Sequence, residues 1–178
     1  MGFFNTNKMI VKLAETNIKT KFGEFKESLF YNGQKESHAL VMGNIEDEED
    51  VLCRVHSSCI FAHHFNSIEC DCREQMEISQ QLIQKAGKGI VIWLEQEGKG
   101  NGHFALIKSI EHKKKGVPQA EAYEKVGFNK DARDFTVAAE ILAFLKVKSV
   151  KMLTNNPNKV ATLTKHGIIV TGIQKTEL

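Results

Sequence analysis

Three of the four cysteines in this chain of 178 residues fall within a window of 14 residues. Cys59 ends the segment Arg-Val-His-Ser-Ser-Cys, and one residue separates Cys70 from Cys72. Three thiolates can hold a zinc ion and leave its fourth position open for water, which is the arrangement of a catalytic rather than a closed structural site. The sequence therefore predicts a catalytic zinc site with Cys59, Cys70 and Cys72 as ligands.

The same cysteines could instead be three small buried hydrophobic side chains, which is what a single cysteine usually is. Charged neighbours such as Glu69 and Arg73 suit a polar site better than a core. The pattern therefore favours metal over core for this cluster. Cys53, directly before Arg54, is expected in the core.

The composition predicts one compact domain over residues 1–178, with residues 1–8 expected to be flexible. Hydrophobic residues make up 42% of the chain, which is enough apolar material for one core. The 24 basic and 22 acidic residues give a net charge of +2, without the basic excess typical of nucleic-acid-binding proteins. We therefore expect a small-molecule substrate and no nucleic-acid partner.

The location of the protein is predicted from its apolar stretches and its cysteines. No apolar stretch approaches the roughly 20 residues that cross a bilayer, and the N-terminus lacks the apolar region of a signal peptide. Unevenly placed cysteines favour a metal site in a reducing compartment over a disulfide framework. We therefore expect a cytoplasmic protein with no membrane partner.

The hydrophobic pattern is rich in strands at first and then alternates between strands and helices. Strands are predicted at 9–13, 23–31, 39–45 and 51–56, and later at 89–94, 150–153 and 168–170. Helices are predicted at 72–86, 103–114, 135–145 and 160–166, with a polar connection at 115–125. This order predicts an α/β fold with mixed α+β character: a single domain with a mixed sheet flanked by helices and a strand-rich N-terminal part.

A glycine-rich segment follows the apolar strand predicted at 89–94. Three glycines, Gly98, Gly100 and Gly102, fall within five residues. Ligands of open α/β sheets commonly bind at the carboxyl ends of strands. We therefore expect this segment to form part of a binding site.

Five motifs occur along the chain in one order. They are Arg-Val-His-Ser-x-Cys, Cys-Asp-Cys-x-x-Gln, Gln96-Glu-Gly-Lys-Gly-Asn-Gly102, Val126-Gly-Phe-Asn-Lys-Asp-Ala-Arg-Asp134 and Leu153-Thr-Asn-Asn-Pro-Asn-Lys159. Together they resemble the motifs of the GTP cyclohydrolase II family, whose members open riboflavin biosynthesis. The resemblance runs from about residue 11 to residue 172.

The resemblance implies a hydrolase acting on cyclic amidine C–N bonds. Such an enzyme opens the imidazole ring of GTP, or of a related purine nucleotide, and releases pyrophosphate and formate. The product would be a 2,5-diamino-6-ribosylamino-pyrimidinone 5'-phosphate or its N-formyl intermediate. The resemblance also implies one Zn²⁺ per subunit, Mg²⁺ bound with the triphosphate, and a homodimer.

The resemblance further implies a set of nucleotide contacts. Arg54 and Lys159 would supply positive charge for the phosphates, and Gln75 and Glu97 would pair with a guanine edge. Thr154 and Asn155 could instead cap a following helix. The full set of expected contacts is Arg54, Val55, His56, Ser57, Ser58, Gln75, Glu97, Gly98, Lys99, Thr154 and Lys159.

Two further residues are expected to be catalytic by the same resemblance. Arg133 occupies the position of an arginine that attacks the α-phosphate, and Asp131 would handle its proton. A free guanidinium is protonated and a poor nucleophile, so a neighbouring carboxylate is chemically needed. The alternative is that Asp131 and Asp134 cap the helix that follows.

Several positions depart from the family pattern. A glutamate is replaced by Ser58, a Thr-Gly-Asp segment by residues 61–63, an arginine by Lys99, a tyrosine by Ile110 and a threonine by Gln119. Since isoleucine can neither donate a proton nor hydrogen-bond a water, Ile110 motivates the hypothesis that the reaction stops at the formamido product. His63 and His64 could be new polar groups near the zinc or ordinary surface residues.

Two other functions stay open at this point. Lys99 and Ser58 allow a relative with an altered nucleotide substrate or a place in a specialised pathway. A non-catalytic nucleotide-binding regulator is the third hypothesis, although keeping all three cysteines with Asp131 and Arg133 fits it poorly.

Overall fold

The computed structural model describes residues 10–176, so residues 1–8, expected to be flexible, lie outside the described part. The strands are β1 (Val11–Thr20), β2 (Gly23–Tyr31), β3 (Glu36–Met42), β4 (Val51–Ser57), β5 (Gly89–Leu94), β6 (Ser149–Leu153) and β7 (Ile169–Gln174). The helices are α1 (Ile60–His63), α2 (Cys72–Ala86), α3 (His103–Lys114), α4 (Gln119–Lys125), α5 (Thr136–Phe144) and α6 (Pro157–Lys165), with a 3-10 turn, η1, at Glu97–Gly100.

Within residues 10–176 the strands form one seven-stranded sheet in the order β1-β2-β3-β5-β4-β6-β7. The pairs β1–β2, β2–β3 and β3–β5 are antiparallel. The pairs β5–β4, β4–β6 and β6–β7 are parallel. The α/β fold with a mixed sheet and a strand-rich first part is therefore confirmed.

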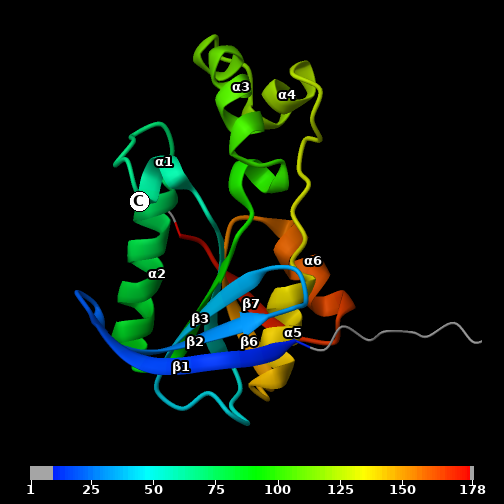
Figure 1. Cartoon of the computed structure of the whole chain (residues 1–178). Coiled ribbons are helices and arrows are strands. Elements are labelled where there is room, and N and C mark those ends of the chain that lie inside the picture. Colours follow the sequence, from blue (N-terminus) through cyan, green and yellow to red (C-terminus); the bar gives the residue numbers. More distant parts are fainter. Residues whose placement is uncertain (1–9, 177–178) are drawn as a thin grey trace, which may run out of the picture.

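Helices lie on both faces of the sheet, and two more extend beyond its end (Figure 1). On one face, Ile83 of α2 is buried in a cluster with Phe25 and Val91. On the other, Leu142 of α5 and Leu163 of α6 belong to the largest apolar cluster. Helices α3 and α4 pack against each other at the far end of the sheet.

Three of the strand predictions are wrong at their ends, including β7, which spans Ile169–Gln174 rather than 168–170. Strand β1 continues to Thr20 rather than ending at 13, and β3 spans Glu36–Met42 rather than 39–45; Met9 lies outside the described residues. Strand β1 is at the edge of the sheet and most of its side chains are exposed. An exposed edge strand needs no hydrophobic alternation, so its pattern ends before the strand does.

The polar connection predicted at 115–125 is also wrong, because it contains helix α4. This helix has seven residues, and it buries Ala122 and Tyr123. Two turns are too few for a 3.6-residue period to stand out in a sequence. The single-turn helix α1 escaped prediction for the same reason.

Helix α6 begins earlier than the predicted residue 160. Pro157 occupies its first turn, and the Asn156 side chain accepts a hydrogen bond from the Asn158 N–H at 2.9 Å. Proline fits the first turn because its missing N–H would be unpaired there anyway. Asn156 therefore caps this helix, rather than Thr154 or Asn155.

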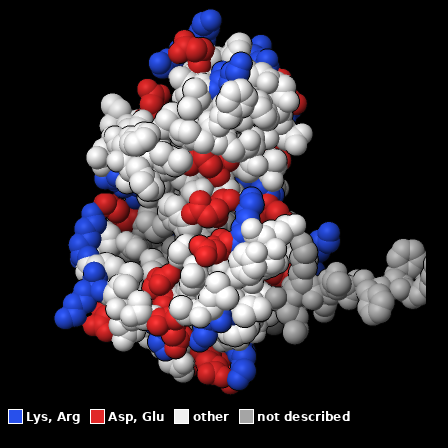
Figure 2. Space-filling view, viewed as in Figure 1, with Lys and Arg blue, Asp and Glu red and all other residues white. Residues whose placement is uncertain are grey.

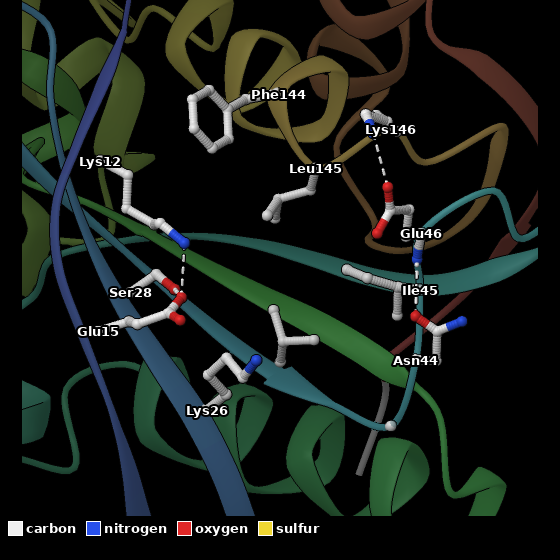
Figure 3. A pocket seen from close by; sticks show the side chains of 12 residues that line it. Lys12, Glu15, Lys26, Ser28, Asn44, Ile45, Glu46, Phe144, Leu145 and Lys146 are labelled. Carbon is white, nitrogen blue, oxygen red and sulfur yellow. Dashed lines mark hydrogen bonds and ion pairs between the residues drawn. The ribbon is translucent and has the colours of Figure 1, made fainter.

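The surface between the sheet and the α3–α4 end is hollowed, and side chains of both charges are interspersed on that face (Figure 2). None of the helices in residues 10–176 is long and apolar enough to cross a membrane. A separate cavity of about 300 Å³ lies at the end of β3 and the loop that follows it, and it is also lined by β1, β2 and the end of α5 (Figure 3). Two ion pairs lie in its lining, Lys12 with Glu15 at 2.6 Å and Lys146 with Glu46 at 2.7 Å, together with Lys26.

Candidate active site

A cavity of about 260 Å³ lies where strands β4 and β5 end and the glycine-rich turn η1 begins. Segments far apart in the sequence meet here, because the parallel strands β4, β5 and β6 deliver their carboxyl ends to one edge of the sheet. Thirteen of the sixteen predicted site residues line it: Arg54, His56, Ser57, Ser58, Cys59, Cys70, Cys72, Gln75, Glu97, Gly98, Lys99, Arg133 and Lys159.

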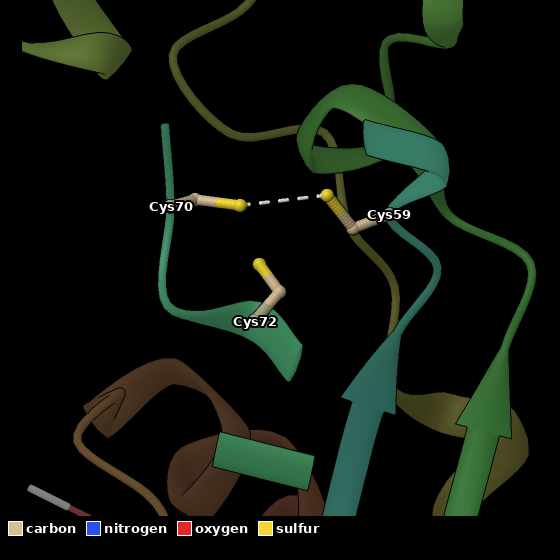
Figure 4. Close-up of side chains that lie close together, drawn as sticks. All are labelled: Cys59, Cys70 and Cys72. Atoms are coloured by element: carbon tan, nitrogen blue, oxygen red, sulfur yellow. Dashed lines mark hydrogen bonds between the residues drawn. The ribbon is translucent and has the colours of Figure 1, made fainter. Parts of the chain in front are cut away.

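The three cysteine thiols converge on one point of this cavity (Figure 4). Cys59 follows β4, Cys70 lies in the loop after α1, and Cys72 opens α2. Their sulfur atoms lie within 4.8 Å of one another, and the Cys59 and Cys70 sulfurs are 3.7 Å apart. Tetrahedral zinc with Zn–S bonds of about 2.3 Å would hold its sulfurs about 3.8 Å apart, so the donor set fits a zinc ion.

The electrostatics of the thiols point the same way. Hydrogen bonding from Cys59 and then Cys72 lowers the pKa of the Cys70 thiol. Hydrogen bonding from Cys70 raises the pKa of Cys59, hydrogen bonding from Cys59 and then Cys70 raises the pKa of Cys72, and burial adds to both rises. Three neighbouring thiolates therefore repel one another, and a bound cation would let all three lose their protons.

Backbone contacts hold the Cys59 segment in place. The Glu97 Oε2 accepts a hydrogen bond from the Ile60 N–H at 2.7 Å. The Arg73 guanidinium donates to the Ala62 carbonyl from Nε at 2.9 Å and from Nη2 at 2.6 Å. Turn η1 and helix α2, which carries Cys72, thereby fix the position of Cys59.

Four cationic side chains line the part of the cavity away from the α3–α4 end: Arg54, Lys99, Arg133 and Lys159. Burial, followed by the charge of Arg54, lowers the pKa of Lys159 to about 7. Burial, followed by the charge of Arg133, lowers the pKa of Lys99. Positive charges crowded in this way favour a polyanionic ligand, which would relieve their repulsion.

Two of these cations are anchored by the end of the sheet. Arg54 is 3% exposed, and it donates from Nη1 to the Leu153 carbonyl at 3.0 Å and from Nη2 to the Gln75 Oε1 at 2.5 Å. Lys159 donates to the Val55 carbonyl at 2.7 Å. Their positions are thus set by strands β4 and β6 rather than by a flexible surface.

Asp131 and Arg133 form an ion pair beside the cavity. The Asp131 carboxylate accepts hydrogen bonds from the Arg133 Nε at 2.9 Å and from its Nη2 at 2.5 Å. Burial alone would raise the pKa of Asp131, but the hydrogen bonds and charge of Arg133 outweigh it and lower the pKa. Asp134, in contrast, accepts from the N–H of Thr136, the first residue of α5, while Phe135 occupies the N-cap position, so the contact at the start of this helix comes from Asp134 and Asp131 is paired with Arg133.

The turn η1 is bound to the segment that carries this pair. The Ala132 N–H donates to the Lys99 carbonyl at 2.9 Å. A Cβ atom on Gly100 would lie 2.6 Å from the Ala132 carbonyl carbon, and Gly100 has a φ of +82°. Only glycine permits both this φ and this close approach. Gly100 therefore sets the distance between Lys99 and Arg133.

Three predicted site residues do not line the cavity. The Val55 side chain is fully buried in the largest apolar cluster, on the other face of β4. Thr154 is 1% exposed, and its Oγ1 accepts from the Asn156 N–H at 3.0 Å. Asp131 reaches the cavity only through Arg133. The nucleotide contacts predicted for Val55 and Thr154 remain predictions.

Four polar side chains expected to contact the nucleotide have protein partners already, including Gln75 and Glu97, which are expected to pair with the base. The Gln75 amide donates to Asp71 at 2.6 Å and accepts from Arg54, and Glu97 holds Ile60. His56 accepts from the Arg54 Nε through its Nδ1 at 3.3 Å, and burial lowers its pKa well below 6.5. The Ser58 Oγ accepts from the Gln96 N–H at 3.0 Å.

The two histidines left open by the sequence lie off the cavity. His63 hydrogen-bonds the Cys59 carbonyl through Nδ1 at 2.9 Å, and its ring packs edge-on against Trp93 with centroids 4.9 Å apart. His64 is exposed. His63 therefore supports the backbone of Cys59, and His64 is a surface residue.

Helices α3 and α4 supply lining residues that the sequence prediction missed. Tyr123, buried on α4, lines the cavity together with Leu106 and Lys113 of α3. Lys113 belongs to a basic run that predicts a solvated helix end, yet it donates to the Glu69 carbonyl next to Cys70. Ile110 and Gln119, two of the departures from the family pattern, lie in the same lining.

The cavity thus combines a thiol cluster that fits a metal ion with a group of cations that fits an anionic ligand. It lies at the strand ends of an α/β sheet, where such proteins commonly bind their ligands. The family model for GTP cyclohydrolase II matches residues 11–175. The chain therefore belongs to the GTP cyclohydrolase II family.

Individual relatives agree with this assignment. GTP cyclohydrolase-2 of Histophilus somni (strain 2336) is 41% identical over 158 residues, which are 88% of this chain and 73% of that protein. The riboflavin biosynthesis protein RibBA of Endomicrobium trichonymphae is 36% identical over 168 residues, which are 93% of this chain. The chain spans only 42% of that RibBA protein.

The fold is also found in a solved structure. This structure is that of RibBX, a two-domain 3,4-dihydroxy-2-butanone 4-phosphate synthase from A. baumannii, with a TM-score of 0.56 over 95% of this chain and 41% of that chain. The sequence identity is 16%, so the likeness concerns the fold alone.

Proposed function

We propose that the protein is a zinc-dependent hydrolase that opens the imidazole ring of GTP or a related purine nucleotide and releases pyrophosphate and formate. The observation that carries this proposal is the meeting of three thiols and four cations in one cavity. The relatives named GTP cyclohydrolase-2 support the choice of substrate. One such domain would comprise residues 1–178.

Cys59, Cys70 and Cys72 would hold the zinc ion. When bound, zinc lowers the pKa of a water toward about 7 and so supplies a nucleophile for C8 of the purine at neutral pH. The other residues of the cavity would hold the base next to the three cysteine sulfur atoms. Leu106 and Ile110 line the same cavity with apolar side chains and would shield the bound ring from bulk water.

The four cations would bind the phosphates, with Mg²⁺ accompanying the triphosphate. Arg133 would attack the α-phosphorus: an N–P bond forms, the bond to the bridging oxygen breaks, and pyrophosphate leaves. Asp131 holds the guanidinium by Nε and Nη2, while no residue in the described range hydrogen-bonds Nη1. Nη1 is therefore the nitrogen free to react, and Asp131 is placed to take up the proton. Hydrolysis of the N–P bond then frees the nucleoside monophosphate group.

A related purine nucleotide is the second candidate substrate. Gln75 and Glu97, the expected partners of the guanine edge, already hydrogen-bond protein groups. Either the guanine of GTP replaces these hydrogen bonds with its own, or other residues of the cavity contact the base. Comparing turnover of GTP, GDP, GMP and ATP separates the alternatives. The homodimer remains a prediction from the family resemblance, and the cytoplasmic location remains a prediction from the apolar stretches and the cysteines.

The proposal is tested by incubating the purified protein with GTP and Mg²⁺ and measuring zinc content, pyrophosphate and the ring-opened pyrimidine. We expect one zinc per chain and both products. Cys59→Ser should lose zinc and ring opening, whereas Cys53→Ala, a change at the buried cysteine outside the cluster, should retain both. Ring opening by the Cys59→Ser protein would disprove the metal mechanism.

A further inference from the structure

Tyr123 places a phenol in the candidate active site. Its ring is 1% exposed and packs in an apolar cluster with Ala105 and Leu106, against Phe61 and Phe128. Such packing leaves a tyrosine few rotamers, so the hydroxyl has a fixed position. Tyr123 is therefore a rigid element of the cavity wall.

The hydroxyl end of this ring belongs to the cavity. A Cβ atom built on Gly98 would lie 3.5 Å from the Tyr123 hydroxyl oxygen, so the phenol reaches the turn that carries Glu97 and Lys99. The cavity lined by Tyr123 is the one lined by the three cysteines. Tyrosine hydroxyls in buried settings usually have a hydrogen-bond partner. No residue between 10 and 176 provides one here, so the hydroxyl is available to a ligand.

The other α3 and α4 side chains that line the cavity have no hydroxyl to offer a ligand, and their polar groups are already hydrogen-bonded. Leu106 and Ile110 are apolar, and Lys113 is engaged with the Glu69 carbonyl. The Gln119 amide donates to the Ser109 Oγ at 2.9 Å. Among the described lining residues of these two helices, Tyr123 supplies the hydroxyl.

We propose that the Tyr123 hydroxyl donates a hydrogen bond to the formyl oxygen of the ring-opened intermediate and promotes release of formate. This inference rests on the proposed function and decides between its two products. The hypothesis drawn from Ile110 stops the reaction at the formamido compound. Because α4 supplies a phenol to the same cavity, we expect the formate-free diaminopyrimidine instead.

The step is an amide hydrolysis. Water adds its oxygen to the formyl carbon, the C–N bond breaks, the amine nitrogen takes up a proton, and formate leaves. Negative charge gathers on the formyl oxygen as the water adds, and a preplaced donor stabilises it. A phenol is protonated at neutral pH and can donate without first losing or gaining a proton.

The test is the ratio of formate to ring-opened pyrimidine produced from GTP. The unchanged protein should give a ratio near one. Since removal of a single such donor costs roughly 100-fold in rate, Tyr123→Phe should accumulate the formamido compound, visible as a product heavier by the mass of CO. Tyr31→Phe, at the chain's other tyrosine on β2, is the matched control and should keep the ratio of the unchanged protein. Adding Ile110→Tyr to Tyr123→Phe should restore formate release, because a phenol returns to the same cavity.

The outcomes separate the two proposals. A Tyr123→Phe protein that releases formate at the normal ratio overturns the role of Tyr123 alone. An unchanged protein that stops at the formamido compound overturns it as well. Failure of the unchanged protein to open the ring of any purine nucleotide overturns the proposed function, and the role of Tyr123 with it.

Discussion

The cavity has two halves that differ in how they are built. The thiol half, Cys59, Cys70 and Cys72, comes from one stretch of 14 residues, and its geometry fits one ion. The cationic half, Arg54, Lys99, Arg133 and Lys159, is gathered from four segments spread over more than 100 residues of the chain. One half depends on local spacing and the other on sheet topology. The two proposed reactions should therefore be separable by changes in each half.

The largest expected effect is in the thiol half. Cys72→Ala should lower ring opening by more than about 100-fold, because loss of residues that only support metal ligands already costs 10–100-fold. Pyrophosphate release should persist, since Arg133 is unchanged. Both products are measured by liquid chromatography with mass detection. Equal loss of both products would show that the halves do not act separately.

The converse change in the cationic half is Arg133→Lys, which keeps the charge but loses the two-pronged contact with Asp131. We expect pyrophosphate release to fall roughly 100-fold, with zinc content unchanged. Lys130→Ala, which removes a nearby exposed cation paired with Glu124, serves as control and should release pyrophosphate normally. Undiminished release by Arg133→Lys would argue against nucleophilic attack by the guanidinium.

A smaller effect is expected where the glycine-rich turn meets the Arg133 segment. Gly100→Ala forces a Cβ atom against Ala132 and should destabilise the fold by about 1–3 kcal/mol. Gly116→Ala makes the fair comparison, since Gly116 has the similar φ of +83° with nothing within 4 Å. Urea unfolding should show the larger loss for Gly100→Ala, and nucleotide affinity should fall while zinc content holds. Equal losses in both variants would mean that backbone strain, not the contact with Ala132, governs the turn.

The smallest predicted effect is a pH dependence from Lys159. Its pKa of about 7 in the free protein lies below the ordinary lysine value, and only the protonated form attracts phosphate. Nucleotide affinity should therefore weaken as pH rises above about 7, by at most about tenfold per pH unit. Lys159→Met cannot titrate and should bind more weakly with a flatter profile. Isothermal titration from pH 6 to pH 9 checks this, and parallel profiles for the two proteins would contradict it.

The sequence predicted the thiol half more completely than its surroundings. Three cysteines within 14 residues cannot lie far apart in the fold, so the sequence spacing alone predicted that their sulfur atoms would meet. The cationic half could be anticipated because the five motifs resemble one family, while the buried state of Arg54 and Lys159 depends on how β4 and β6 pair. Whether a charged side chain is buried depends on how distant segments pack, so it could not be predicted from the sequence alone.

The α3–α4 end was the least predictable part of the site. Helix α4 is too short for a period to show, so Tyr123 lay unnoticed in a segment expected to be a polar connection. Ile110 stood out as a missing phenol because a motif gave it a reference position. Tyr123, the phenol that would compensate for Ile110, lies in none of the five motifs. It reaches the cavity because α4 packs against α3.

The most direct test of the two-half account is metal removal from the unchanged protein. Zinc is stripped with a chelator, and pyrophosphate and ring-opened pyrimidine are measured in the same reaction with GTP and Mg²⁺. We predict that ring opening stops, that pyrophosphate release continues, and that added Zn²⁺ restores ring opening. Ring opening at an undiminished rate in protein shown to be free of zinc would contradict the account.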